Sequence, residues 1–404
     1  MPRALITGIR GQDGRYLSEF LLGKGYEVFG LIHDASPDDP ALAHELPLVR
    51  LIPGDLTDLA SLILACQEAQ PDEIYNLGAQ SDVHLSFREP AATMKVNGRG
   101  PRNLLEAIRR SAIPNVKFYQ ASSSEMFGNV GALPYSETTP FHPQSPYAKA
   151  KLKAHRIIRM YREDHGMFAA TGICFNHESP RRGENFVTRK ISLAVARIAS
   201  EQQAKLVLGN LDAQRDWGFA KEYVEAMWLI LQQAEPDDFV ISTGESHSVS
   251  EFAELAFSRI GISDWKSYVA QDRRLFRPVD PDLCGDSTRA REILGWKPTV
   301  GFEQLVNMMV DADLRMLSTG CHGLGCRFLC PRTAAVTAPP SRTSPGTVIA
   351  APPLAVVAAA TASASAGSLE LTAPGRPPPA VPRPRGRCRL IRPSPGSLSR
   401  RGPS

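Results

Sequence analysis

Residues 5–14 read Leu5-Ile6-Thr7-Gly8-Ile9-Arg10-Gly11-Gln12-Asp13-Gly14. A short apolar run ends at the first glycine, and a helical pattern follows the last one. Gly8 allows a tight turn, Gly11 lets a pyrophosphate approach the backbone, and Gly14 lets the helix pack closely against the strand. The helix N-terminus offers free N–H groups and the positive end of its dipole to phosphate oxygens. The stretch therefore predicts a dinucleotide-binding loop; a plain strand-to-helix turn is the alternative.

The first half of the chain repeats this alternation of strand and helix. Strands are expected over residues 3–7, 27–32, 51–53, 73–77 and 117–121, and helices over 12–24, 58–69, 90–110 and 146–164. Such alternation is typical of a doubly wound parallel sheet. The fold class is therefore α/β, with a Rossmann-type NAD(P)-binding core over residues 1–170.

The pattern becomes more irregular after residue 170. Helices are expected over residues 186–200, 221–233 and 250–261, with a strand over 239–243. A mixture of this kind predicts a smaller substrate-binding lobe, residues 171–318, interleaved with the core.

The last part of the chain has a different composition. Ten arginines and one acidic residue, Glu370, lie after residue 330, so this segment carries a formal charge of +9 and residues 1–330 carry −5. The same segment holds 15 of the 33 prolines. Residues 319–404 are therefore expected to form a disordered Pro/Ala/Arg-rich tail. The acidic balance of the remainder argues against a nucleic-acid partner.

Other features of the sequence argue against membranes, disulfides and metals. There is no run of 18 or more apolar residues and no signal-peptide pattern at the N-terminus, so a cytoplasmic protein without a membrane partner is expected. The seven cysteines do not suggest a disulfide framework. Cys321, Cys326, Cys330 and His322 match no common zinc spacing, so no metal site is predicted.

The ends of later strands add candidates for binding the cofactor. Asp34 ends the second strand, where a carboxylate binds the ribose hydroxyls and favours NAD. Arg10 instead favours NADP, because a guanidinium can bind the 2′-phosphate of that cofactor. The candidates after the third and fourth strands are Asp55, Leu56, Leu77, Gly78, Ala79, Gln80 and Ser81.

Tyr147 and Lys151 are separated by one helical turn, so they share a helix face. A phenol is a poor base at neutral pH because its reference pKa is about 10. A neighbouring ammonium and a cationic nicotinamide would both lower that pKa. The pair therefore predicts a catalytic base, with an ordinary surface pair as the alternative.

A second reactive group follows the fifth strand, in Ser122-Ser123-Ser124-Glu125. Hydroxyl groups at this edge can hold a substrate oxygen. Glu125 can take a proton α to a carbonyl and return it to a leaving oxygen; a helix-capping carboxylate is the alternative. In the lobe, Lys190, Arg215 and Arg277 suit the oxygens of a diphosphate, although each is also compatible with an ordinary surface charge.

These residues and several longer runs resemble the GDP-mannose 4,6-dehydratases, a family of the extended short-chain dehydrogenase/reductase superfamily. The most specific run is Asn176-His-Glu-Ser-Pro-Arg-Arg-Gly183, and the resemblance covers about residues 1–318. Further matching runs are residues 4–14, 70–77, 118–125, 145–148, 186–190 and 209–217.

The resemblance implies conversion of GDP-mannose to GDP-4-dehydro-6-deoxy-mannose, the first step toward GDP-fucose and related deoxyhexoses. Hydride would pass from C4 to NADP and back to C6. Tyr147 would take the proton of the C4 hydroxyl, and Glu125 would remove the C5 proton and protonate the departing C6 oxygen. Ser123 would assist them, Lys151 would orient the cofactor ribose, and the enzyme would be a homodimer or homotetramer.

The family also implies which residues contact each ligand. Expected cofactor contacts are Gly8, Ile9, Arg10, Gly11, Gln12, Asp13, Gly14, Val96, Lys151, His177 and Arg182, besides the strand-end candidates above. Expected substrate contacts are Asn176, Lys190, Arg215 and Arg277.

The chain departs from the family at two of these places. Ser123 stands where the family usually has threonine, which keeps a hydroxyl. His33-Asp34 stands where the family usually has two arginines, so NADP is the family's expectation and NAD the one favoured by Asp34.

Three other functions remain open at this point. A sugar-nucleotide 4-epimerase would need the Tyr/Lys pair but not Glu125. A non-catalytic NAD(P)-sensing protein would need neither. A binder of anionic partners would act through the tail.

Overall fold

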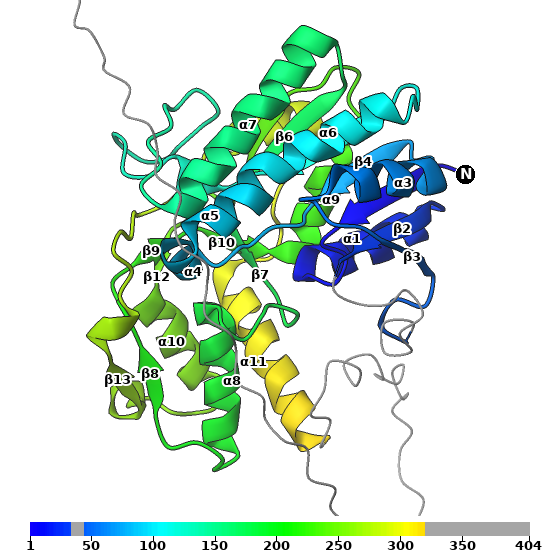
Figure 1. Cartoon of the computed structure of the whole chain (residues 1–404). Coiled ribbons are helices and arrows are strands. Elements are labelled where there is room, and N and C mark those ends of the chain that lie inside the picture. The colour runs from blue at the N-terminus through cyan, green and yellow to red at the C-terminus, as the bar shows by residue number, and fades with distance from the viewer. Residues whose placement is uncertain (34–43, 320–404) are drawn as a thin grey trace, which may run out of the picture. The chain divides into compact units, whose positions relative to one another are not determined.

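A parallel sheet of seven strands forms the centre of the protein (Figure 1). In this computed structural model, residues 1–33 and 44–319 are described. In spatial order the strands are β11 (Asp238–Ile241), β6 (Ala169–Cys174), β5 (Lys117–Ala121), β4 (Glu73–Asn76), β1 (Arg3–Thr7), β2 (Glu27–Ile32) and β3 (Val49–Pro53). The predicted α/β class is confirmed. The strand order reverses between β1 and β4: β2 and β3 are added on one side of β1, and the later strands are added on the other side. Sheets of this type open a crevice for a ligand at that point.

The sheet is buried because its strands are apolar on both faces. One face, represented by Leu5 and Phe118, packs against α3 (Leu59–Ala69), α6 (Gly100–Arg110) and α7 (Pro146–His165). The opposite face, represented by Ile6 and Tyr119, packs against α1 (Gln12–Gly23) and α9 (Ala220–Leu231). Alternation of side chains along each strand thus supplies two separate cores.

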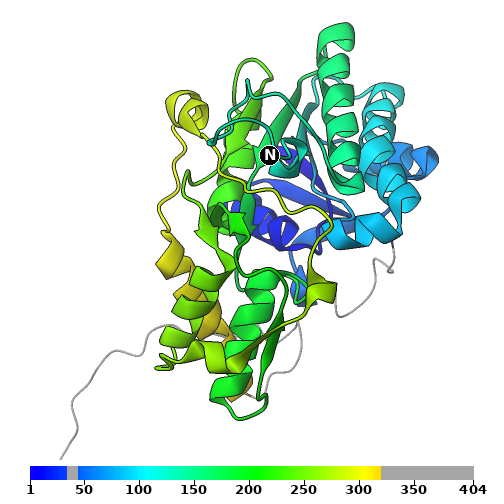
Figure 2. The same ribbon diagram turned by 90° about the vertical axis from the view of Figure 1, so that its left-hand side faces the viewer.

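A second group of elements lies together below the sheet in Figures 1 and 2. Three helices, α8 (Val187–Ala199), α10 (Val249–Ser258) and α11 (Phe302–Ser318), share a core with Trp217. Three small two-stranded sheets accompany them: β7 (Asn176–Glu178) with β10 (Trp217–Phe219), β9 (Gln214–Arg215) with β12 (His247–Ser248), and β8 (Leu206–Leu208) with β13 (Val269–Gln271).

One strand of the main sheet is not among the strands expected from the sequence. Strand β6 extends across residue 170, where the sequence suggested a boundary, and all six of its residues are buried. The small residues of β6 conceal the apolar pattern of a buried strand. They are needed because a side chain at Gly172 would collide with the Tyr119 hydroxyl. The chain returns to the main sheet through β11, which overlaps the strand expected over residues 239–243.

The helix expected over residues 90–110 is divided into three parts. These are α5 (Pro90–Thr93), the π-helical segment η1 (Met94–Arg99) and α6. Pro101 has no backbone N–H to donate, and Gly98 brings η1 close to the backbone at Ala150 of α7.

Some predictions fall on residues that the structure does not describe. Asp34 and residues 320–404 of the predicted tail lie outside the described residues, as do Cys321, Cys326 and Cys330. In the part that is described, no helix has both the length and the apolar character needed to cross a membrane.

Candidate active site

The glycine loop joins β1 to α1, as predicted, and its glycines are needed for its shape. Gly8 has φ +69°, and a Cβ atom there would lie 2.8 Å from the Gly78 nitrogen. A Cβ atom at Gly14 would lie 2.6 Å from the Ile9 Cα. Within the described residues, no side chain caps the start of α1 at Gly11. The open N-terminus and the bare backbone fit the pyrophosphate of a dinucleotide.

The residues that follow strands β3 and β4 form the other side of this crevice. The Thr7 hydroxyl accepts a hydrogen bond from the Gly78 N–H at 2.9 Å, which ties β1 to the segment after β4. A side chain at Gly78 would press on Leu56, so these two predicted residues are neighbours. The Asp55 carboxylate accepts hydrogen bonds from the backbone and hydroxyl of Thr57, and its pKa is lowered although burial opposes the change.

The segment Leu77–Ser81 is held by a residue that sequence reasoning missed. Asn97 in η1 accepts a hydrogen bond from the Gln80 N–H at 2.8 Å and donates one to the Gln80 carbonyl at 2.7 Å. Asn97 is buried, next to the predicted Val96. A buried amide in an apolar helical pattern was the signal in the sequence, but its partner could not be identified there.

His177 lies in β7 and meets the first turn of α1. Its Nε2 lies 2.9 Å from Asp13 Oδ2, and its Nδ1 lies 2.8 Å from the Phe175 carbonyl oxygen. Burial alone would lower the pKa of His177, but the Asp13 carboxylate and this carbonyl raise it. Burial alone would raise the pKa of Asp13. The charge and hydrogen bond of His177 outweigh burial, so the pKa of Asp13 is lowered. Both shifts favour an imidazolium that donates to two acceptors.

Further contacts join the glycine loop to the segment that follows β7. Gln12 donates a hydrogen bond to the His177 carbonyl at 3.0 Å and accepts one from the Ser179 hydroxyl at 2.7 Å. Nearby, Arg182 lies over the ring of Phe186, 3.5 Å from its centroid. The structure therefore brings His177 of the predicted lobe to the predicted cofactor loop, and the Arg182 charge lies near enough to act on Asp13 of that loop.

Tyr147 and Lys151 lie on the buried face of α7, beside the end of β5. The helix begins at Ser145, whose hydroxyl accepts a hydrogen bond from the Ala148 N–H at 3.0 Å, and Pro146 occupies its first turn. The Lys151 ammonium donates to the Ala121 carbonyl at 2.9 Å and lies 5.7 Å from the centroid of the Tyr147 ring. The predicted pair is thus assembled at the carboxyl end of the sheet.

The expected direction of the Tyr147 pKa is reversed in the protein alone. Burial raises the pKa of Tyr147 to about 12, and the Glu125 charge acts in the same direction. A hydrogen bond with Ser123 and the positive charge of Arg182 oppose that rise without overcoming it. Burial also lowers the pKa of Lys151 to about 8. In the protein alone, Lys151 therefore does not bring the pKa of the Tyr147 phenol below its usual value.

Ser123 and Glu125 lie immediately after β5, in and beside the turn η2 (Ser124–Met126). The Ser123 hydroxyl accepts a hydrogen bond from the Glu125 N–H at 3.3 Å. The Glu125 carboxylate accepts a hydrogen bond from the Arg277 guanidinium, with Nη1 and Oε1 3.1 Å apart. The four predicted catalytic residues thus lie together at the carboxyl end of β5. Arg277, from a distant part of the sequence, contacts this group through Glu125.

The other predicted substrate residues are more dispersed. Arg215 is buried and already bonded, to Asp280 and to the carbonyl groups of Pro281 and Gln214. Lys190 lines a separate hollow of about 270 Å³ with Arg197 and Lys205. Asn176 is half-buried in β7, one residue before His177.

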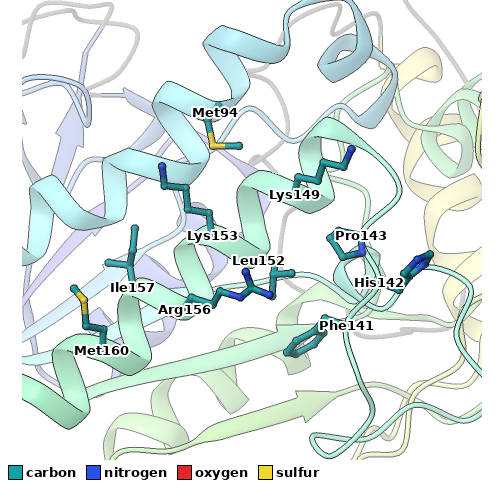
Figure 3. A pocket seen from close by; sticks show the side chains of 10 residues that line it. All are labelled: Met94, Phe141, His142, Pro143, Lys149, Leu152, Lys153, Arg156, Ile157 and Met160. Carbon is teal, nitrogen blue, oxygen red and sulfur yellow. The ribbon is translucent and has the colours of Figure 1, made fainter. Parts of the chain in front are cut away.

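A larger hollow of about 610 Å³ lies along α7, and Tyr147 is not among the residues that line it (Figure 3). Figure 3 shows apolar side chains on its walls and the long side chains of Lys149, Lys153 and Arg156 around them. Its lining residues are Met94, Phe141, His142, Pro143, Lys149, Leu152, Lys153, Arg156, Ile157 and Met160. We call this surface the α7 groove.

Comparison with known proteins agrees with this geometry. The family model described as GDP-mannose 4,6 dehydratase matches residues 5–309. GDP-mannose 4,6 dehydratase 2 of Arabidopsis thaliana is 55% identical over 326 residues, which cover 78% of this chain and 87% of the relative. GDP-mannose 4,6 dehydratase of Homo sapiens is 50% identical over 343 residues, which cover 78% and 92%.

Solved structures show the same fold at lower sequence identity. The UDP-glucose 4-epimerase of Thermus thermophilus, solved as a complex with NAD, is 26% identical, with a TM-score of 0.67, and the match covers 78% of this chain and 99% of that one. The much higher identity to the dehydratases, together with the match over residues 5–309, decides between the two groups. The chain belongs to the GDP-mannose 4,6-dehydratase family of the extended short-chain dehydrogenase/reductase superfamily.

Proposed function

We propose that this protein removes water from GDP-mannose and forms GDP-4-dehydro-6-deoxy-mannose, the first step toward GDP-fucose and related deoxyhexoses. The observation that carries the proposal is the placement of Glu125 beside Tyr147 and Ser123 at the end of β5. A Tyr/Lys pair alone suits many oxidations of an alcohol. The added carboxylate is what elimination of water requires.

In this mechanism Tyr147 takes the proton of the C4 hydroxyl while C4 is oxidised. The new C4 carbonyl makes the C5 hydrogen acidic, and the Glu125 carboxylate removes it. The Glu125 carboxylic acid then gives this proton to the C6 oxygen, the C6–O bond breaks and water leaves. C6 would receive the hydride removed from C4, and C5 would regain one proton, which balances the proton that Tyr147 took from the C4 hydroxyl. The sugar has then lost one water without net oxidation.

The cofactor site fits a nicotinamide dinucleotide, held by the glycine loop, Gly78 and the His177 region. A bound nicotinamide would supply the hydride transfer between C4 and C6, and its positive charge would favour the Tyr147 phenolate. Lys151 donates hydrogen bonds from a fixed position and orients the ribose. We infer NADP as the cofactor, with NAD as the alternative that Asp34 favours; titration with both distinguishes them.

The diphosphate end of the substrate would lie toward the lobe. Arg277 is within reach of the sugar site because it already contacts Glu125. Asn176 and Lys190 complete the proposed contacts, and Arg215 acts from its buried position by holding Asp280 and the backbone at Pro281. The boundaries of core, lobe and tail and a cytoplasmic location remain predictions.

A direct assay tests this function. Purified protein is incubated with GDP-mannose, and the nucleotide product is analysed by mass spectrometry. We expect the product to lack the mass of one water, with no net reduction of nicotinamide. An unchanged mass combined with a changed sugar configuration would instead indicate an epimerase, and an unchanged substrate would contradict both enzymatic functions.

We further propose that two copies of the chain associate through the α7 groove. The groove exposes apolar side chains, among them Met160 with 38% of its surface accessible. The long stems of Lys149 and Lys153 can cover apolar surface while their ammonium groups stay in water. A contiguous apolar hollow beside the helix that carries Tyr147 suits a self-complementary contact, which would fix that helix from its outer side.

Met160→Glu is expected to weaken this dimer by about tenfold or more, because a charge would replace apolar surface that the contact buries. Light scattering after size-exclusion chromatography, at several protein concentrations, measures the change. Leu64→Glu is the matched control, since Leu64 is 65% exposed on α3 outside the groove and should leave the mass unchanged. A monomeric unaltered protein would contradict the proposed dimer.

A further inference from the structure

Glu125 and Arg277 form an ion pair between two parts of the fold. Glu125 lies in η2 after the core strand β5, whereas Arg277 follows the short helix η4 (Arg273–Leu275), which comes directly after β13 of the lobe and lies close to Gly209 at the end of β8. Their side chains meet with Nη1 and Oε1 3.1 Å apart. The proposed proton acceptor is therefore engaged with a cation that itself suits a diphosphate.

The pair is exclusive within the part of the chain that the structure describes. Arg277 is the only described group that donates a hydrogen bond to the Glu125 carboxylate, and Glu125 is the only described acceptor for Arg277. One guanidinium nitrogen is used, so the other N–H groups of the fork have no partner among the described residues.

Arg277 is the more accessible member of this ion pair. The Arg277 side chain is 31% exposed, and the Glu125 side chain is 14% exposed. Arg215 provides the contrast, because its side chain is 6% exposed and is fixed by Asp280 and two carbonyl groups. Of these two arginines, Arg277 is therefore the one whose fork is open to a ligand from solvent.

A diphosphate is a stronger partner for this fork than the single bond to Glu125. Guanidinium groups bind phosphate oxygens through two parallel hydrogen bonds, and each such bond is charge-assisted. A carboxylate oxygen that accepts from a guanidinium has one lone pair fewer to offer to a C–H proton. Transfer of Arg277 to the diphosphate would leave Glu125 Oε1 open toward the sugar.

We propose that Arg277 is a positioning residue that exchanges Glu125 for the substrate diphosphate, so that the base is released only when the nucleotide is bound. The inference rests on the proposed function, in which Glu125 removes the C5 proton. It adds a specificity device to that reaction: a sugar without a diphosphate leaves Arg277 on Glu125, and the carboxylate stays engaged.

The exchange has a reciprocal consequence for binding. If Glu125 and the diphosphate compete for Arg277, then removal of the Glu125 charge must strengthen nucleotide binding. The effect must also disappear when Arg277 is absent. Both statements concern binding of GDP, so they are independent of turnover.

The test is a double-mutant cycle in the full chain, with GDP as the probe and isothermal titration calorimetry as the measurement. Glu125→Gln is expected to lower the Kd for GDP by about threefold to fivefold. Arg277→Gln is expected to raise it by about tenfold or more. The double variant should match Arg277→Gln alone, and Glu125→Ala repeats the cycle with a second side chain.

Several outcomes would overturn the exchange. An unchanged Kd in Glu125→Gln would show that no competition exists. Equal tightening with and without Arg277 would show a general effect of removing negative charge. Failure of the unaltered protein to bind GDP would also remove it. The proposed dehydration is judged separately by the product from GDP-mannose, so dehydration without coupling would leave the function standing and reject only the exchange.

Discussion

Glu125→Gln is expected to slow the formation of GDP-4-dehydro-6-deoxy-mannose by about 10³-fold, because an amide cannot accept the C5 proton. The substitution keeps the size of the side chain and leaves a carbonyl oxygen facing Arg277. The backbone N–H of residue 125 still donates to the Ser123 hydroxyl. The variant should therefore fold and bind the cofactor as the unaltered protein does.

Mass spectrometry of the nucleotide product measures this loss, and a thermal-shift titration with NADP checks cofactor binding. Glu89→Gln is the matched control, because Glu89 is exposed and lies outside the site, at the end of the short helix α4 (Val83–Arg88). The control should retain full activity. Unchanged turnover in Glu125→Gln, or loss of cofactor binding in that variant, would contradict the assigned role.

The parts of the fold that were predicted correctly depend on neighbours in sequence. Gly8, Gly11 and Gly14 report a local turn and a helix start, so their position beside β1 could be read directly. Tyr147 and Lys151 share a helix face because of helical spacing alone. The strand β6 was missed because close packing against Tyr119 requires Gly172 and small neighbours, which conceal its apolar pattern.

The parts that could not be predicted depend on long-range contacts. Nothing in the residues around Glu125 indicates that Arg277 will reach it, since 152 positions separate the two. The pKa of Tyr147 was expected to fall because of Lys151 and a cationic nicotinamide, but in the protein alone burial by the whole fold raises it. Cofactor, substrate and catalytic roles of the individual residues stay predictions until variants are measured.

A second long-range pair leads to the largest expected change in stability. Arg189 of α8 and Asp313 of α11 form an ion pair whose side chains are each 1% exposed. Asp313 also accepts a hydrogen bond from the Ser192 hydroxyl at 2.7 Å. Both helices belong to the lobe core, so this polar contact lies within an apolar cluster and fixes the helix that carries Lys190.

Asp313→Ala is expected to lower the free energy of unfolding by about 3–5 kcal/mol, because the Arg189 guanidinium would lose its carboxylate in the protein interior. The midpoint of urea unfolding, followed by circular dichroism, measures the change. Asp311→Ala is the matched control on the same helix. Its partner Arg259 is 46% exposed and Asp311 is 30% exposed, so the control should cost less than about 1 kcal/mol.

A third variant separates the cost of removing the carboxylate from the loss of packing. Replacing both members, Arg189→Met together with Asp313→Leu, removes the two charges and fills the space with apolar atoms. If the cost in Asp313→Ala comes from a buried guanidinium that has lost its carboxylate, then this double variant should recover most of the lost stability. A double variant as unstable as Asp313→Ala would show that packing around these side chains is responsible. Equal costs for Asp313→Ala and Asp311→Ala would contradict the prediction, because burial is the feature that distinguishes the two ion pairs.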